Sequence, residues 1–157
     1  MGCYGFFSLQ SYVYTPRFWR TSPEFRNLVN QAILCDVAVE RQVEIMGPDA
    51  AKFTQFLICR NLRTCEIGRY KYVLITDQDG GIINDPKLLK LAEGRFWLSI
   101  ADSDVLLWAK GVAATVGMDV KISEPDVSPL QLQGPLSREI LRAAFSDETA
   151  ALKYYRF

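Results

Sequence analysis

The stretch DQDGGIINDP, residues 77–86, sets the pattern for the middle of this sequence. Its paired glycines, Gly80 and Gly81, are typical of a tight hairpin turn, which requires backbone conformations that glycine adopts without strain. An apolar segment, RYKYVLIT (69–76), precedes the turn, and two more, GIINDPKLLKL (81–91) and RFWLSIA (95–101), follow it. We therefore expect three strands joined by short turns, forming a continuous antiparallel meander over residues 69–101.

Asp85 is a carboxylate inside the middle strand, directly before Pro86. One interpretation is an edge residue beside a proline that blunts the sheet. The other is a carboxylate held in a cleft to meet a ligand. Asn84 stands next to it, and strand alternation points the two side chains to opposite faces. For Asn84, a polar residue near a turn and a ligand contact are equally good interpretations.

The rest of the chain alternates helices and strands. Helical patterns are TSPEFRNLVNQA (21–32), MGPDAAKFTQFLI (46–58), DSDVLLWAKGVAATVGM (102–118, with Asp102 as N-cap) and PLSREILRAAF (135–145). Strand patterns are CDVAVERQVEI (35–45), DVKIS (119–123), SPLQLQG (128–134) and ALKYYRF (151–157). Segments 43–57 and 130–144 share the order strand, Gly-Pro, helix, which indicates either a duplication or common punctuation. The pattern predicts an α+β fold, in which helices pack on one face of antiparallel sheets.

Composition excludes several classes of function. The 18 basic and 18 acidic residues balance, so neither nucleic acid nor a membrane is expected as a partner. The absence of histidine excludes Ser-His-Asp and Cys-His catalysis and His-ligated metals. The four cysteines form no C-x-x-C pair, so we expect no metal site and reduced, buried thiols in a cytoplasmic protein. No segment reaches the length of a membrane span.

Four stretches carry a resemblance to a known family: CDVAVERQVEIMGPDAAKFTQFL, YVLITDQDGGIINDPKLLKL, FWLSIADSDVLLWAKGVA and EPDVSPLQLQGP. Together they resemble the folate-dependent family of the glycine cleavage T-protein, or aminomethyltransferase. Within it, VERQVEI and SIADSDVLLWAKG favour the dimethylsulfoniopropionate demethylase branch. The resemblance runs from about residue 34 to the end, so we expect an N-terminal extension over residues 1–33 and a folate-binding domain over residues 34–157.

The resemblance implies a tetrahydrofolate-dependent enzyme that transfers a methyl group from the sulfonium of dimethylsulfoniopropionate to tetrahydrofolate. By position it implies that Asp85 is catalytic and contacts the folate, and that Asn84 and Gln133 are further folate contacts. Upstream, where the family borders its substrate, Tyr12 or Tyr14 is the candidate for substrate binding.

Two alternatives remain for the activity: aminomethyl transfer, as in glycine cleavage, and a non-catalytic folate-binding module. The final residues, LKYYRF, stop inside an expected strand, and the family continues beyond them. We therefore expect a truncated chain that is inactive alone and that self-associates through the face left exposed.

Overall fold

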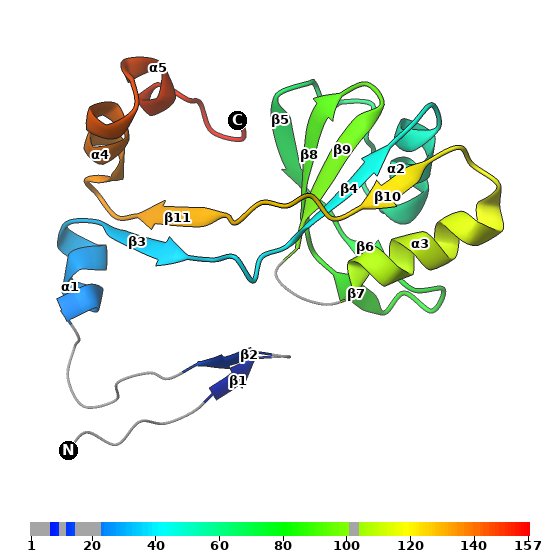
Figure 1. Ribbon diagram of the computed structural model, residues 1–157, viewed down its shortest axis with the longest axis horizontal. Helices are drawn as coiled ribbons and strands as arrows, with labels where there is room; N and C mark the ends of the chain where they lie inside the picture. The colour runs from blue at the N-terminus through cyan, green and yellow to red at the C-terminus, as the bar shows by residue number, and fades with distance from the viewer. Residues whose placement is uncertain (1–6, 10–11, 15–22, 101–103) are drawn as a thin grey trace. The chain divides into compact units, whose positions relative to one another are not determined.

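The computed structural model describes residues 7–9, 12–14, 23–100 and 104–157 (Figure 1). They form two compact units. The first comprises residues 1–37 and 129–152, and the second comprises residues 38–128 and 153–157. The domain boundary expected after residue 33 stays a prediction.

The second unit is built on a five-stranded antiparallel sheet in the order β10-β4-β9-β8-β5, and a separate hairpin, β6-β7. The strands are β4 (Gln42–Met46), β5 (Arg69–Tyr72), β6 (Ile75–Thr76), β7 (Ile82–Asn84), β8 (Lys87–Ala92), β9 (Arg95–Ser99) and β10 (Lys121–Ser123). The helices are α2 (Ala50–Leu57) and α3 (Val105–Val116).

The meander over residues 69–101 is antiparallel throughout, as predicted, but it is not continuous. The first expected strand breaks at Val73–Leu74 into β5 and β6, and the middle one breaks at Asp85–Pro86 into β7 and β8. Pro86 has no backbone N–H to donate to a ladder, which accounts for the second break. The two breaks face each other, because the Val73 N–H donates to the Pro86 carbonyl at 3.0 Å.

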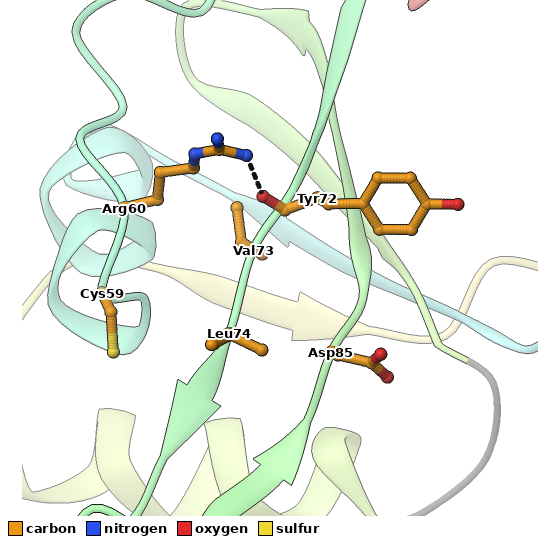
Figure 2. A pocket seen from close by; sticks show the side chains of 6 residues that line it. All are labelled: Cys59, Arg60, Tyr72, Val73, Leu74 and Asp85. Carbon is orange, nitrogen blue, oxygen red and sulfur yellow. Dashed lines mark hydrogen bonds between the residues drawn. The ribbon is translucent and has the colours of Figure 1, made fainter.

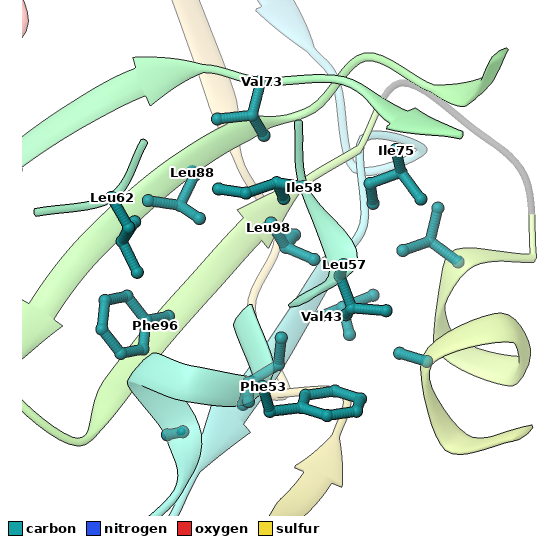
Figure 3. Packing of buried hydrophobic residues seen from close by; sticks show 14 of the residues in the cluster. Val43, Phe53, Leu57, Ile58, Leu62, Val73, Ile75, Leu88, Phe96 and Leu98 are labelled. Atoms are coloured by element: carbon teal, nitrogen blue, oxygen red, sulfur yellow. The ribbon is translucent and has the colours of Figure 1, made fainter. Parts of the chain in front are cut away.

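One hydrophobic core joins this sheet to both of its helices (Figure 3). Val43 and Ile45 of β4 pair with Leu98 and Phe96 of β9, so their side chains share one face of the sheet. That face meets Phe53 and Leu57 of α2 and Val105 and Ala109 of α3 in a single buried cluster. The predicted fold class, an α+β protein with helices on one face of an antiparallel sheet, is confirmed.

The other face of the sheet holds a buried carboxylate, Glu44. It accepts hydrogen bonds from Trp97 Nε1 at 2.8 Å and from Arg95 Nε at 2.7 Å. Burial by itself raises the pKa of Glu44, but these two hydrogen bonds and the charges of Arg95 and Lys121 outweigh it, so the pKa lies below its ordinary value of 4.5.

In its described residues, the first unit contains two short antiparallel sheets and three helices. Its elements are β1 (Phe7–Leu9), β2 (Tyr12–Tyr14), α1 (Pro23–Asn30), β3 (Ile33–Asp36), β11 (Leu130–Gln133), α4 (Ser137–Ala144) and α5 (Asp147–Ala150). Strand β1 pairs with β2, and β3 pairs with β11. Among the described residues of this unit, Ala150 is the only buried apolar side chain. Large apolar side chains are instead exposed, Leu34 to 65% and Phe145 to 74%.

The repeated Gly-Pro order corresponds to a repeated structure. Gly47 follows β4 at φ +135° and Gly134 follows β11 at φ +132°, values that only glycine adopts readily. A Cβ on Gly47 would lie 2.5 Å from the Asp119 carbonyl oxygen, and one on Gly134 would lie 2.6 Å from the Gln31 carbonyl oxygen. In each case the glycine packs against the chain that is about to enter the partner strand.

The hydrogen bonds around the two glycines also correspond one to one. The N–H two residues after each glycine donates across to the partner chain, from Asp49 to the Asp119 carbonyl and from Leu136 to the Gln31 carbonyl. Two copies of the order helix, strand, strand, Gly-Pro, helix therefore occur: α1-β3-β4-α2 and α3-β10-β11-α4. Strand β4 pairs with β10, and β3 pairs with β11. The second unit therefore contains β4-α2 of the first copy and α3-β10 of the second, and the first unit contains α1-β3 and β11-α4.

Three other expectations are corrected. CDVAVERQVEI is two strands, since β3 ends at Asp36 and β4 begins at Gln42, each in a different sheet. ALKYYRF is a turn with one bridge, Arg69 to Arg156, rather than a strand. The residue at the N-cap position of α3 is Asp104, and Asp102 lies outside the described residues.

Candidate active site

A hollow of about 410 Å³ lies where the two long strands break (Figure 2). Its lining comes from the segment that follows α2 and from the two breaks: Cys59, Arg60, Tyr72, Val73, Leu74 and Asp85. Two backbone hydrogen bonds hold the breaks in place. The Val73 N–H donates to the Pro86 carbonyl, and the Cys59 N–H donates to the Leu74 carbonyl at 3.2 Å. Backbone hydrogen bonds therefore fix the strand breaks that border the hollow.

Asp85 is exposed and its carboxylate borders this hollow. Figure 2 shows it on the strand next to Val73 and Leu74, extending to the same side of the view as the Tyr72 ring. Asn84 is buried, with an exposed fraction of 6%, so the two neighbours point to opposite sides as the alternation predicted. The sequence order Asn-Asp-Pro therefore places an amide in the interior and a carboxylate at the surface of a cavity.

Arg60 supplies the positive charge of this hollow. Its Nη1 donates to the Tyr72 carbonyl at 2.8 Å, which fixes the guanidinium against β5. The lining thus combines an apolar floor, one aromatic ring, one carboxylate and one guanidinium. Such a mixture of apolar surface and a few placed polar groups is typical of sites for small organic ligands.

The remaining predicted site residues lie elsewhere. Gln133 is exposed at the end of β11, in the first unit, whereas Asn84 and Asp85 belong to the second unit. Tyr12 and Tyr14 are in β2 of the first unit, and their side chains lie outside the described part of the structure. All five residues remain candidates, and Asp85 is the one that borders the hollow.

The sequence analysis did not single out three residues of the lining as site residues: Cys59, Arg60 and Tyr72. The Tyr72 side chain is 47% exposed. Cys59 is exposed and Cys65 is buried, so the expectation of buried thiols holds for only one of these two. The signal that could have found Tyr72 is its place two residues before Leu74, at the point where an alternating strand ends in consecutive apolar residues.

Metal binding finds no support in the described residues. No group of three or more Cys, Asp or Glu side chains among them is arranged to hold a metal ion. The DQDGG turn is a hairpin turn closed by Asp77, whose Oδ1 accepts from the N–H groups of Asp79 and Gly81 at 3.0 and 2.7 Å. Within the described residues, no helix is long and apolar enough to cross a membrane.

A family model described as the GCVT N-terminal domain matches residues 4–157. Dimethylsulfoniopropionate demethylase DmdA of Ruegeria pomeroyi is 40% identical over 122 residues, which cover 78% of this chain and 34% of the demethylase. An aminomethyltransferase of Clostridium botulinum is 28% identical over 137 residues, covering 85% of this chain and 37% of that protein.

A solved structure supports the fold. The glycine cleavage system aminomethyltransferase T from Bartonella henselae superimposes with a TM-score of 0.81 at 22% identity, over 98% of this chain and 43% of that one. The chain thus spans 34 to 37% of the length of these curated relatives.

Proposed function

The chain belongs to the GCVT N-terminal domain family, and from this premise we propose that it forms the folate-side part of a tetrahydrofolate-dependent one-carbon transferase. We further propose that the one-carbon group is the methyl group of dimethylsulfoniopropionate. The support for the donor is the similarity to the demethylase, which at 40% exceeds the 28% to an aminomethyltransferase.

The observation that carries the proposal is the Asp85 carboxylate at the hollow between the strand breaks. A volume of about 410 Å³ falls within the range of roughly 300–1,000 Å³ that is typical of small-molecule sites. The apolar floor and the Tyr72 ring suit a flat heterocycle, and a carboxylate suits the N–H donors of a reduced pterin. Tetrahydrofolate supplies the ring nitrogen that accepts the one-carbon group.

Asp85 has a specific task in such a transfer. A sulfonium loses its methyl group with a neutral leaving group, so sulfur needs no general acid. What the reaction requires is alignment of the accepting nitrogen with the methyl carbon. A carboxylate at the hollow orients the acceptor through a hydrogen bond and stabilises the positive charge that develops as the nitrogen is methylated. In the proposed reaction the same carboxylate accepts the proton that the nitrogen then releases.

Aminomethyl transfer is the second candidate, because the aminomethyltransferase of Clostridium botulinum matches a longer part of the chain than the demethylase does, 137 residues against 122. The two activities differ in the donor. Methyl transfer from dimethylsulfoniopropionate uses a free small molecule, whereas aminomethyl transfer in glycine cleavage uses a lipoyl carrier protein. Supplying each donor in turn therefore distinguishes them.

The test separates binding from turnover. Tetrahydrofolate binding is measured on residues 1–157 by fluorescence titration. We expect this chain alone to be inactive, since it spans 34% of the demethylase. Formation of 5-methyltetrahydrofolate is therefore measured in the Ruegeria pomeroyi demethylase with its matching segment replaced by this chain.

For the variant Asp85→Asn we expect turnover to fall about 10²- to 10³-fold, because a group that acts on developing charge contributes mainly in the transition state. The dissociation constant for tetrahydrofolate should change by less than about threefold. The matched control is Asp79→Asn, in the exposed turn of the same hairpin. Equal turnover in Asp85→Asn and the parent would refute the role of Asp85, and absence of tetrahydrofolate binding would refute the proposed function.

A further inference from the structure

A separate hollow of about 410 Å³ lies between α2, the segment that follows it and the hairpin of β8 and β9. The described residues that line it are Ala51, Lys52, Gln55, Leu62, Arg63, Lys90, Glu93 and Phe96. None of these described residues borders the hollow at Asp85. We call this second hollow the α2 hollow, and the proposed methyl transfer uses no residue of its lining.

The Gln55 amide gives the α2 hollow a fixed wall. Its Nε2 donates to the Arg60 carbonyl at 3.1 Å, and its Oε1 accepts from the Leu62 N–H at 2.7 Å. One side chain therefore ties the segment after α2 back onto the helix, directly before Arg63. A segment that is already tied loses little freedom when a ligand binds, which favours affinity.

Lys90 brings a charge to the face of the sheet that packs on α2. It follows Leu88 by two residues in β8, so strand alternation points its side chain to the same face as that fully buried leucine. Only 13% of the Lys90 side chain is exposed, and its Nζ lies 2.9 Å from Glu93 Oε2. The Glu93 side chain is 78% exposed, in the turn between β8 and β9.

The charge of the α2 hollow is positive. Lys52 and Arg63 are both exposed, and within the described part of the chain neither takes part in an ion pair. Lys90 and Glu93 neutralise each other, so the described lining carries two cations in excess. A phosphate monoester carries a charge of about −1.5 to −2 at pH 7, which these two cations match. A single carboxylate would neutralise only one of them.

The size of the α2 hollow indicates a ligand with an organic part. Its volume of about 410 Å³ falls within the range of roughly 300–1,000 Å³ that is typical of small-molecule sites. The buried side chains of Leu62 and Phe96 contribute apolar surface to the lining. The lining thus offers apolar contacts to an organic group and two cations to an anionic group.

We propose that the α2 hollow binds the phosphate monoester of a small organic molecule, with Lys52 and Arg63 contacting the phosphate oxygens. The fork of N–H donors on a guanidinium matches phosphate geometry, and an ammonium adds a point charge. Glu93 limits the affinity, because it neutralises Lys90 and repels the anion. This inference does not depend on the proposed function, since the two hollows share no described residue.

The experiment is a calorimetric titration of the 157-residue chain with phenyl phosphate, inorganic phosphate and benzoate. Phenyl phosphate joins an apolar ring to a phosphate monoester, and each of the other two probes lacks one of these parts. We expect phenyl phosphate to bind with a Kd below about 1 mM at low salt, at least about tenfold more tightly than either other probe. Raising the salt from about 50 to about 300 mM should weaken its binding, because the cations are exposed.

Variants locate the site on the chain. Lys52→Gln and Arg63→Gln should each weaken the binding of phenyl phosphate about tenfold, through loss of a charge-assisted hydrogen bond. Glu93→Gln should tighten it about three- to tenfold, because Lys90 is then free to contact the ligand, and a misfolded variant could not produce this gain. The control is Lys110→Gln, which removes an exposed charge from α3 and should leave the affinity within about twofold.

Several outcomes would overturn the inference. One is absence of phenyl phosphate binding up to about 10 mM. Another is equal affinity in the parent, Lys52→Gln and Arg63→Gln, because the ligand would then lie elsewhere on the chain. Benzoate or inorganic phosphate binding as tightly as phenyl phosphate would overturn the assignment to a phosphate ester. Weaker binding in Glu93→Gln would overturn the role given to Glu93.

Discussion

Replacing Gly47 by alanine should destabilise the second unit more than any other single methyl addition that we describe. The backbone at this residue has φ +135°, a conformation that costs a residue with a Cβ about 1–3 kcal/mol. The new methyl would also lie 2.5 Å from the Asp119 carbonyl oxygen and 3.1 Å from Val120 Cα. Both are backbone atoms, so the strand that follows them would have to move.

Forcing such a shift in a packed region adds about 1–3 kcal/mol. The two contributions together predict a loss of about 2–6 kcal/mol, a large share of the roughly 5–15 kcal/mol that stabilises a typical domain. At roughly 2–4 °C per kcal/mol for a protein of this size, the midpoint of thermal unfolding should fall by about 10 °C. Circular dichroism at increasing temperature measures the midpoint, and urea titration measures the free energy of unfolding.

The matched control is Gly111→Ala. Gly111 lies inside α3, and no heavy atom lies within 4 Å of the position that its Cβ would take. Alanine favours a helix interior over glycine by about 0.8–1.0 kcal/mol, so this variant should be slightly more stable than the parent. A Gly47→Ala protein that unfolds within 0.5 kcal/mol of the parent would refute the reasoning, since about 2 kcal/mol is the least that it predicts.

Three further predictions concern other parts of the chain. The pKa of Glu44 is lower in the folded chain than its ordinary value of 4.5, so its charged form stabilises the fold above pH 4.5 and this contribution is lost as the pH falls through the folded pKa. The variant Glu44→Gln should therefore lose less free energy of unfolding between pH 6 and pH 3 than the parent. Urea titration at each pH measures the difference. Burial raises the pKa of the Cys65 thiol, whereas Cys59 is exposed, so a maleimide at pH 7.5 should modify Cys59 first and Cys65 only on unfolding, as followed by peptide mass spectrometry. We also propose that the chain self-associates through its exposed apolar residues, and that Phe145→Glu shifts the sedimentation velocity toward the monomer, because this side chain is 74% exposed.

Each of these has a contrary outcome. An identical pH profile for Glu44→Gln and the parent would show that the Trp97 and Arg95 contacts do not stabilise the charged form. Modification of both thiols at one rate would show that Cys65 is accessible in the folded chain. Concentration-independent sedimentation of the parent would exclude self-association in the range tested.

Local patterns predicted the individual elements well, because the spacing of apolar residues that is typical of a strand or a helix is present within the element itself. The Gly-Gly turn predicted the hairpin at residues 77–81, and Gly-Pro predicted the starts of α2 and α4. The residues at Val37, Val39 and Val43 alternate as one strand would, yet β3 and β4 join different sheets. Strand β3 pairs with residues at least 94 positions away and β4 with residues at least 49 positions away, and no local period indicates these partners.

The candidate site could be predicted only in part for a similar reason. A carboxylate before a proline conflicts with a continuous apolar strand, and this left both an edge residue and a ligand contact open for Asp85. The family resemblance then favoured the ligand contact. No local pattern distinguishes Cys59 and Arg60, because they follow α2 in a polar loop where such residues are ordinary. Their place beside Asp85 arises from the bridge between Ile58 and Ile75, a pairing of two segments with no shared motif.

The division of the chain into units has a consequence for synthesis. Most of the second unit is one uninterrupted segment, residues 38–128, while the first is assembled from residues on both sides of it. The chain leaves the first unit at Val37 and returns at Pro129, and a hydrogen bond of 3.2 Å joins these two residues. Strand β3 therefore leaves the ribosome nearly a hundred residues before its partner β11. Domains that are continuous in sequence fold as they emerge, so the second unit should be the first to fold, and β3 should stay unpaired until β11 has been synthesised.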